Sequence, residues 1–250
     1  MLAGATIGVA GSASAADLKA PPMRAAPYNW SGCYVGGFGG WATANNWAST
    51  DLGSVGTGGT FARYSGGAGQ WNYSENSSFL GGGTLGCNWQ PWLNSGLVLG
   101  IEGEGGYFSL SGSALQPNSV DVIGSSKMGN GYGLIAGRVG WAFFERVLLY
   151  GKAGVAFYNS SASVANSTAS VGLPDTIAAT GSKSQSPFTV GGGVEYAMWD
   201  HWTGKFEYMF VDGGSSYNAC GVDSTFGQTF CWQQVPSSIH LVKIGLNYKF

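Results

Sequence analysis

The end of the chain alternates strictly between two kinds of side chain. Val242, Ile244, Leu246, Tyr248 and Phe250 fall on one face of an extended chain, whereas Lys243, Gly245, Asn247 and Lys249 fall on the other. A period of two is that of a β-strand with one apolar and one polar face. The same alternation marks five further segments upstream, and it is weaker in two Gly-rich, aromatic segments near the start, Trp30 to Trp41 and Phe79 to Trp89. Each segment is close to the roughly 9–11 residues of a transmembrane strand. The chain therefore predicts eight strands.

The connections between these segments alternate between long and short. Long stretches of Ser, Asn, Gly and Thr cover residues 42–76, 109–130, 159–185 and 213–236, and short turns lie near 90–95, 144–146 and 200–201. No run of about 18–20 apolar residues could span a bilayer as a helix. This pattern is typical of outer-membrane barrels. We therefore predict an all-β fold, an eight-stranded antiparallel up-and-down transmembrane β-barrel with four long external loops and short periplasmic turns.

Charged residues decide between a soluble and a membrane barrel. They make up only 10% of the chain, with a net charge of −2 and no cluster of Lys or Arg, so a nucleic-acid partner is excluded. A lipocalin-like soluble barrel would have an apolar inside, but here the charged face of the strands is rich in small Gly and Ala. This suits a narrow barrel with ion pairs inside. The predicted interior charges are Glu102, Glu104, Arg138, Lys152, Glu195, Lys205, Glu207 and Lys243.

Aromatic residues gather at the ends of the predicted strands. They are Trp30, Trp41, Trp89, Trp92, Trp141, Tyr196, Trp199, Trp202 and Tyr248. Aromatic girdles mark the two bilayer interfaces of outer-membrane barrels. We expect these side chains to form such girdles. The alternative is that they pack in a soluble core, which the scarcity of surface charge disfavours.

The N-terminus carries the pattern of an exported protein. Residues 1–16 are uncharged and end in small residues, which predicts a secretory signal peptide. Its basic start is missing, which fits a true start upstream of Met1; a tail of small residues without structure is the alternative. Residues 17–29 predict a Pro-containing periplasmic leader, and residues 30–250 the barrel domain. The expected location is the outer membrane of a Gram-negative bacterium, reached through the general secretory pathway.

A series of motifs in order resembles a known family. The motifs are Trp30 to Gly36, Gly86 to Gln90, Gly137 to Ala142, Val190 to Ala197, Trp202 to Asp212 and Gly245 to Phe250. Across residues 17–250 the chain resembles the alphaproteobacterial outer-membrane immunogenic proteins, which are opacity-like eight-stranded barrels, some of them haemin-binding. The resemblance implies a structural, surface-exposed role in the envelope. A small porin or a haemin-binding receptor is the alternative.

The resemblance also implies partners. They are outer-membrane lipid and lipopolysaccharide, an extracellular ligand of the loops, and the barrel-assembly machinery, which recognises a terminal strand such as the one ending in Tyr248 and Phe250. An apolar residue at the end of a lipid-facing strand is the simpler interpretation of Phe250, and the two are compatible.

Four cysteines in an exported chain permit three pairings in an oxidising compartment. Cys220 and Cys231 lie in the last long connection, so we expect them to form a disulfide. An antiparallel hairpin would bring Cys33 and Cys87 together near the periplasmic side. The family pattern places aromatic residues at both positions, and their joint replacement predicts a second disulfide. Two separate thiols remain the alternative.

Residues with catalytic or metal-binding chemistry are scarce. The two histidines, His201 in a short turn and His240 in the last strand, have no ligand-like neighbours, so no metal or cofactor is expected. Ser238 and His240 would share a strand face near the outer leaflet, as a nucleophile and a base would in a lipid-modifying enzyme. No orienting carboxylate completes a triad, so no catalytic residue is assigned.

Overall fold

The computed structural model describes residues 28–55, 61–62, 69–92, 96–117, 122–144, 146–166, 178–222 and 227–250. The predicted signal peptide and all but the last two residues of the predicted leader lie outside these ranges. No helix in the described part of the chain is long and apolar enough to span a membrane.

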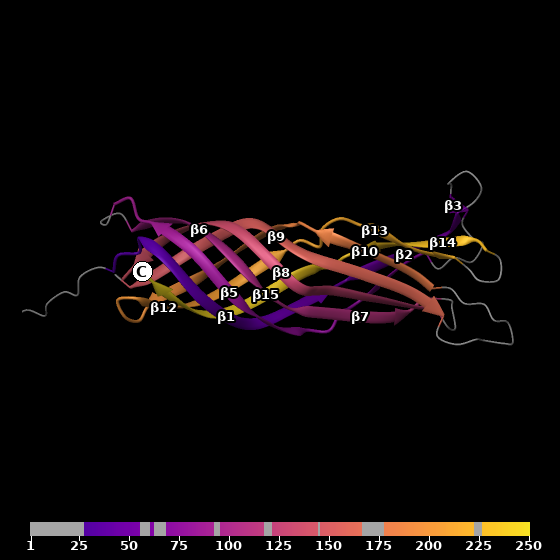
Figure 1. The fold of residues 1–250 in the computed structure, drawn as a ribbon, viewed down its shortest axis with the longest axis horizontal. Coiled ribbons are helices and arrows are strands. Elements are labelled where there is room, and N and C mark those ends of the chain that lie inside the picture. The colour runs from indigo at the N-terminus through magenta and orange to yellow at the C-terminus, as the bar shows by residue number, and fades with distance from the viewer. Residues whose placement is uncertain are drawn as a thin grey trace, which may run out of the picture.

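Eight antiparallel strands close into a barrel, as Figure 1 shows. They are β1 (Gly32–Asn45), β5 (Ser78–Trp89), β6 (Leu97–Tyr107), β8 (Val122–Phe143), β9 (Val147–Asn166), β11 (Phe188–Ala197), β12 (Trp202–Val211) and β15 (Ser238–Lys249). Each strand pairs with the next, and β15 pairs with β1 from Tyr34 opposite Lys249 to Asn45 opposite Ser238. The predicted fold class is confirmed, and closure leaves no free strand edge within this part.

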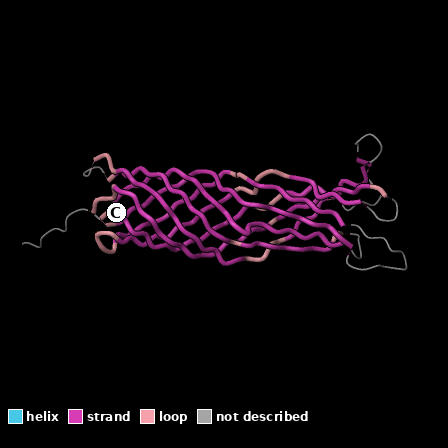
Figure 2. The backbone as a smooth tube through the Cα atoms, viewed as in Figure 1, coloured by secondary structure: helices cyan, strands magenta, loops and turns pink. Residues whose placement is uncertain are grey.

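The four long connections are not simple loops, so their predicted extents are wrong. Strands continue into them, and Figure 2 shows strand over most of the described chain. The added strands are β2 (Trp47–Val55), β3 (Phe61–Ala62), β4 (Gln70–Tyr73), β7 (Ser109–Leu115), β10 (Ala178–Gln185), β13 (Tyr217–Val222) and β14 (Thr229–Val235). Together with the outer ends of β8 and β9 they form a second barrel section, which we call the extracellular extension.

The physical reason lies in a change of polarity along each long strand. In β9 the outward side chains are Val155 and Phe157 in the lower part, and then Ser161 and Ser163 in the extension. The inward side chains change from charged Lys152 to apolar residues such as Ala162 and Val164. Strands of this kind are indistinguishable from loops by composition, because their outward face carries Ser and Gly instead of long apolar residues.

Two aromatic belts surround the lower barrel. The inner belt, at the end with the short turns, includes Trp89, Trp141, Tyr196, Trp202 and Tyr248, and the outer belt includes Trp41, Phe79, Tyr107, Phe157, Phe188 and Tyr208; all have exposed side chains. Phe79 and Trp89 are ten positions apart in β5, as a strand crossing a bilayer requires. Between the belts the outer surface carries Val, Leu, Ile and Phe side chains.

Trp30 does not belong to a girdle, so this prediction is wrong. Its side chain is only 1% exposed and packs inside the periplasmic mouth against Val98, Leu148 and Ala197. Its backbone N–H donates to the Gln90 side chain at 3.1 Å. The segment before β1 turns into the lumen, so its tryptophan fills the mouth instead of facing lipid.

Glycines at inward strand positions leave space for the other side chains in this narrow lumen. Gly154 in β9 and Gly137 in the adjacent strand β8 allow a test of this. A Cβ added at inward-facing Gly154 would lie 2.0 Å from the carbonyl oxygen of Ile135, whereas one added at Gly137 would meet no atom within 4 Å. We expect Gly154→Ala to lower the folded fraction, since overpacking costs about 1–3 kcal/mol. The heat-modifiable shift in gel migration measures this. Gly137→Ala is the control, and equal behaviour of the two variants would contradict the packing argument.

Candidate functional site

The eight charged residues predicted for the interior all lie inside the lower barrel. They come from six strands: Glu102 and Glu104 from β6, Arg138 from β8, Lys152 from β9, Glu195 from β11, Lys205 and Glu207 from β12, and Lys243 from β15. None is more than 6% exposed. We call this set the lumen network.

Lys152 is the centre of the lumen network. Its ammonium group lies 2.6 Å from Glu102, 2.5 Å from Glu104 and 3.1 Å from Glu207. Lys205 adds a second ammonium group to Glu102 at 3.1 Å. Lys243 bridges Glu104 at 2.7 Å and Glu207 at 2.5 Å. Each of these carboxylates therefore contacts at least two cations.

Arg138 extends the network towards the periplasmic side. Its guanidinium lies 2.6 Å from Glu195 and 3.5 Å from Glu102, and it donates to the Tyr34 hydroxyl at 2.9 Å. It also stacks over the Tyr150 ring, 4.0 Å from the centroid. Arg is suited to this position because its planar group combines ion pairs with stacking.

Five uncharged residues complete the hydrogen bonding, and the charge pattern alone did not identify them. Tyr34 donates to Glu102, Tyr132 donates to Glu104 at 3.3 Å, and Tyr150 donates to Glu207 at 2.9 Å. Thr203 and Asn247 donate to Glu195 at 2.5 and 3.0 Å. All five occupy inward positions of their strands. The sequence signal that could have found them is a polar side chain in phase with the interior charges, such as Tyr150 two positions before Lys152.

The network is suited to holding the barrel together and not to holding a metal ion. Carboxylate oxygens of Glu102, Glu104 and Glu207 lie within 4.8 Å of one another, as metal ligands would. The Lys152 ammonium, however, already bonds to all three. Four positive and four negative side chains give a formal charge of zero. This balance is what burial of charge requires.

The lumen is filled on both sides of the network. Below it, Trp30 and Tyr28 pack edge to face with ring centroids 4.9 Å apart. Above it, the extension holds a cluster of buried apolar and aromatic side chains, which includes Trp47, Trp71, Phe108, Leu110, Met128, Tyr158 and Trp232. Polar side chains and apolar side chains thus form successive layers along the barrel axis.

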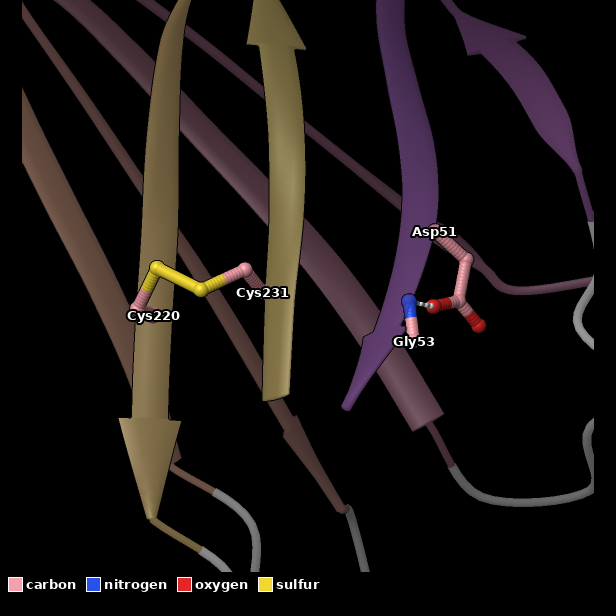
Figure 3. Close-up of a disulfide and its surroundings, with 4 residues drawn as sticks. All are labelled: Asp51, Gly53, Cys220 and Cys231. Carbon is pink, nitrogen blue, oxygen red and sulfur yellow. Dashed lines mark hydrogen bonds between the residues drawn. A yellow bond between two sulfur atoms is a disulfide. The ribbon is translucent and has the colours of Figure 1, made fainter. Parts of the chain in front are cut away.

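Two disulfides join neighbouring strands. Cys33 and Cys87 are opposite each other in β1 and β5, are bonded, and face outward near the periplasmic end. Cys220 and Cys231 are bonded across β13 and β14, as Figure 3 shows. Next to Cys231 the pairing of β14 with β2 shifts register. These are the two pairings expected from the sequence.

The two histidines lie at opposite ends of the lower barrel. The His201 Nδ1 contacts the Lys249 carbonyl oxygen at 2.9 Å, in a periplasmic turn. His240 lies on the outer face of β15, and its Nδ1 is 2.7 Å from the Tyr208 hydroxyl. Ser238 shares that face, but the hydrogen-bond partner of His240 is a phenol. The structure thus brings no carboxylate to this pair within the described residues.

The chain ends on the lipid-facing surface. Tyr248 and Phe250 both point outward, with ring centroids 6.0 Å apart. The Phe250 N–H donates to the Cys33 carbonyl oxygen at 3.0 Å. The last residue therefore takes part in closing the seam between β15 and β1.

A closed antiparallel barrel with an apolar belt outside and ion pairs inside defines an integral outer-membrane protein. The sequence profile of the outer membrane protein beta-barrel domain family matches residues 4–250. The chain belongs to this family, and its location is the outer membrane.

Known relatives agree with this assignment. The chain is 33% identical over 176 residues to the 31 kDa outer-membrane immunogenic proteins of Brucella melitensis and Brucella suis. The match covers 69% of this chain and 66% of those relatives, slightly less than two thirds of their length. Among solved structures, it is similar to OprG of Pseudomonas aeruginosa, with 10% identity, coverage of 89% of this chain and 99% of that chain, and a TM-score of 0.48.

Removal of one charged side chain should show how much the lumen network contributes to the free energy of unfolding. Lys152→Met leaves three carboxylates without their shared cation, and breaking a buried pair typically costs about 3–5 kcal/mol. We expect a loss of that size in the free energy of unfolding, measured by urea titration in lipid vesicles. Lys127→Met is the control, because Lys127 is exposed on the extension. A Lys152→Met protein as stable as the control would contradict a structural role for the network.

Proposed function

We propose that the protein is a closed, non-enzymatic structural barrel that displays its extracellular extension at the cell surface. The observation that carries this proposal is the filled lumen. Charged side chains that bind one another leave no path for ions, and the apolar layer above offers none either. An eight-stranded barrel stabilised in this way can anchor and display a surface structure without transport.

The alternative functions have less support. A haemin receptor would need axial ligands, and the two described histidines are separated by the length of the lower barrel. A lipid-modifying enzyme would need a base oriented by a carboxylate, and the candidate base His240 is hydrogen-bonded to the Tyr208 hydroxyl. A small porin would need a continuous aqueous lumen.

We extend the proposal to partners and processing. Residues 1–16 are a signal peptide, and residues 17–29 a periplasmic leader. The barrel-assembly machinery recognises β15 through its outward Tyr248 and Phe250. An extracellular ligand, where one exists, binds the extension, since binding residues concentrate on surface connections.

Electrical recordings test the closed barrel. We expect the purified protein, inserted in a planar bilayer, to give no stable conductance steps, because ion pairs and the Trp30 segment fill the lumen. A known porin inserted by the same procedure is the positive control. Reproducible single-channel steps that scale with protein concentration would overturn the proposal in favour of the porin.

Assembly tests the terminal residue separately. We expect Phe250→Ala to lower the amount of folded protein in the outer membrane severalfold, because the assembly machinery recognises the aromatic side chain at the chain end, while the backbone bond from residue 250 to Cys33 is kept. The measurement is heat-modifiable protein in membrane fractions. Phe206→Ala is the control, since Phe206 is equally lipid-facing but lies within β12. The same loss in both variants would show that only apolar surface matters.

A further inference from the structure

The extracellular extension, unlike the lower barrel, has one seam without strand pairing. Its strands are bonded in the order β4, β2, β14, β13, β10, β9, β8 and β7, but β7 and β4 are not paired with each other. At the inner end of this seam, the Asn76 N–H donates to the Ser111 carbonyl oxygen at 2.8 Å. Further out, the Gln116 side chain donates to Asp51 at 3.0 Å. Beyond that one backbone bond, side-chain contacts therefore connect the two sides of the seam.

Glu75 lies at this seam and points into the lumen. Its neighbour Asn76 makes the backbone bond to β7. A Cβ added at Gly112 of β7 would lie 3.1 Å from the Glu75 Cγ, so the missing side chain of that glycine leaves room for the glutamate. From β8 the Ser126 hydroxyl donates to Glu75 Oε1 at 3.1 Å. Glu75 thus connects the chain after β4 to strands across the seam.

No cation compensates this carboxyl group within the described part of the chain. Glu75 is 7% exposed, and its Oε2 has no hydrogen-bond partner there. Its titratable neighbours are the phenols Tyr73, Tyr158 and Tyr217, and the other groups that act on it are the hydroxyls of Ser126 and Ser237. Burial raises the pKa of Glu75 to about 7, while the two hydroxyls lower it. Within the described part of the chain, protonation is the remaining means of neutralising it.

We propose that Glu75 is a proton-operated latch on the seam between β4 and β7. With a proton bound, it is a neutral side chain that can be buried between these strands while bonded to Ser126. When it ionises, the same position becomes a buried charge without a partner. The seam then opens, which lets water reach the carboxylate.

The direction of the pH dependence follows from linkage. The pKa in the closed state is raised above the ordinary value of 4.5, so closed protein retains the proton when open protein has lost it. The closed state is therefore fully favoured below about pH 4.5 and loses its advantage as the pH rises to about 7. Within that window the opening equilibrium shifts by up to about tenfold per pH unit.

Amide hydrogen exchange of the whole protein in lipid nanodiscs tests the latch. After correction for intrinsic exchange rates, we expect residues 109–115 and 70–73 to lose at least about tenfold in protection between pH 5 and pH 8. The lower barrel should keep its protection across the same range. Unchanged protection of β7 and β4 in the unaltered protein overturns the proposal without any variant.

Two variants then test whether Glu75 causes the pH-dependent change in protection. Glu75→Gln keeps the hydrogen-bonding shape without a titratable group, so its seam should stay protected equally at pH 5 and pH 8. Asp212→Asn removes an exposed carboxylate between β12 and β13 and should keep the full pH dependence. The proposal fails if Glu75→Gln retains the pH dependence, or if Asp212→Asn abolishes it.

Discussion

The pairing of charges inside a barrel surrounded by lipid is the constraint on which the rest of the structure depends. Lipid excludes charge from the outer face, so every charged side chain of a crossing strand must point inward. A barrel of eight strands has little interior space, so these side chains fit only where their neighbours are small. The glycines at inward strand positions, such as Gly154, and the 10% of charged residues are consequences of the same geometry.

The polarity of the strands reverses where they leave the membrane. In the membrane the outside is apolar and the inside polar; in the extension the outside meets water and the inside is an aromatic cluster. In β8 the outward residue changes from Ile135 to Lys127, and the inward residue from Arg138 to Met128. One continuous strand therefore belongs to two different kinds of core.

This reversal explains how much could be predicted from the sequence. In the membrane section the outward side chains are large and apolar along each strand. The alternation of apolar and polar residues therefore identified the eight strands and all eight interior charges. Beyond the membrane the outward face is Ser-rich, and strands such as β7 and β10 look like loops. The position of Trp30 inside the lumen depends on the path of the chain before β1. The two-residue periodicity of a strand does not predict that path. Tyr34 and Tyr150 were missed because a phenol fits either an interface or a polar interior.

The two sections also differ in how their acids are neutralised, and this determines where the protein can respond to its surroundings. Glu102, Glu104 and Glu207 each contact two or more cations, so the loss of one contact leaves others. Within the described residues Glu75 has serine hydroxyls as donors and no cation, beside an unpaired seam. Under the proposed latch, opening is therefore expected in the section outside the membrane, where it costs no contact with lipid and exposes the interior to the medium.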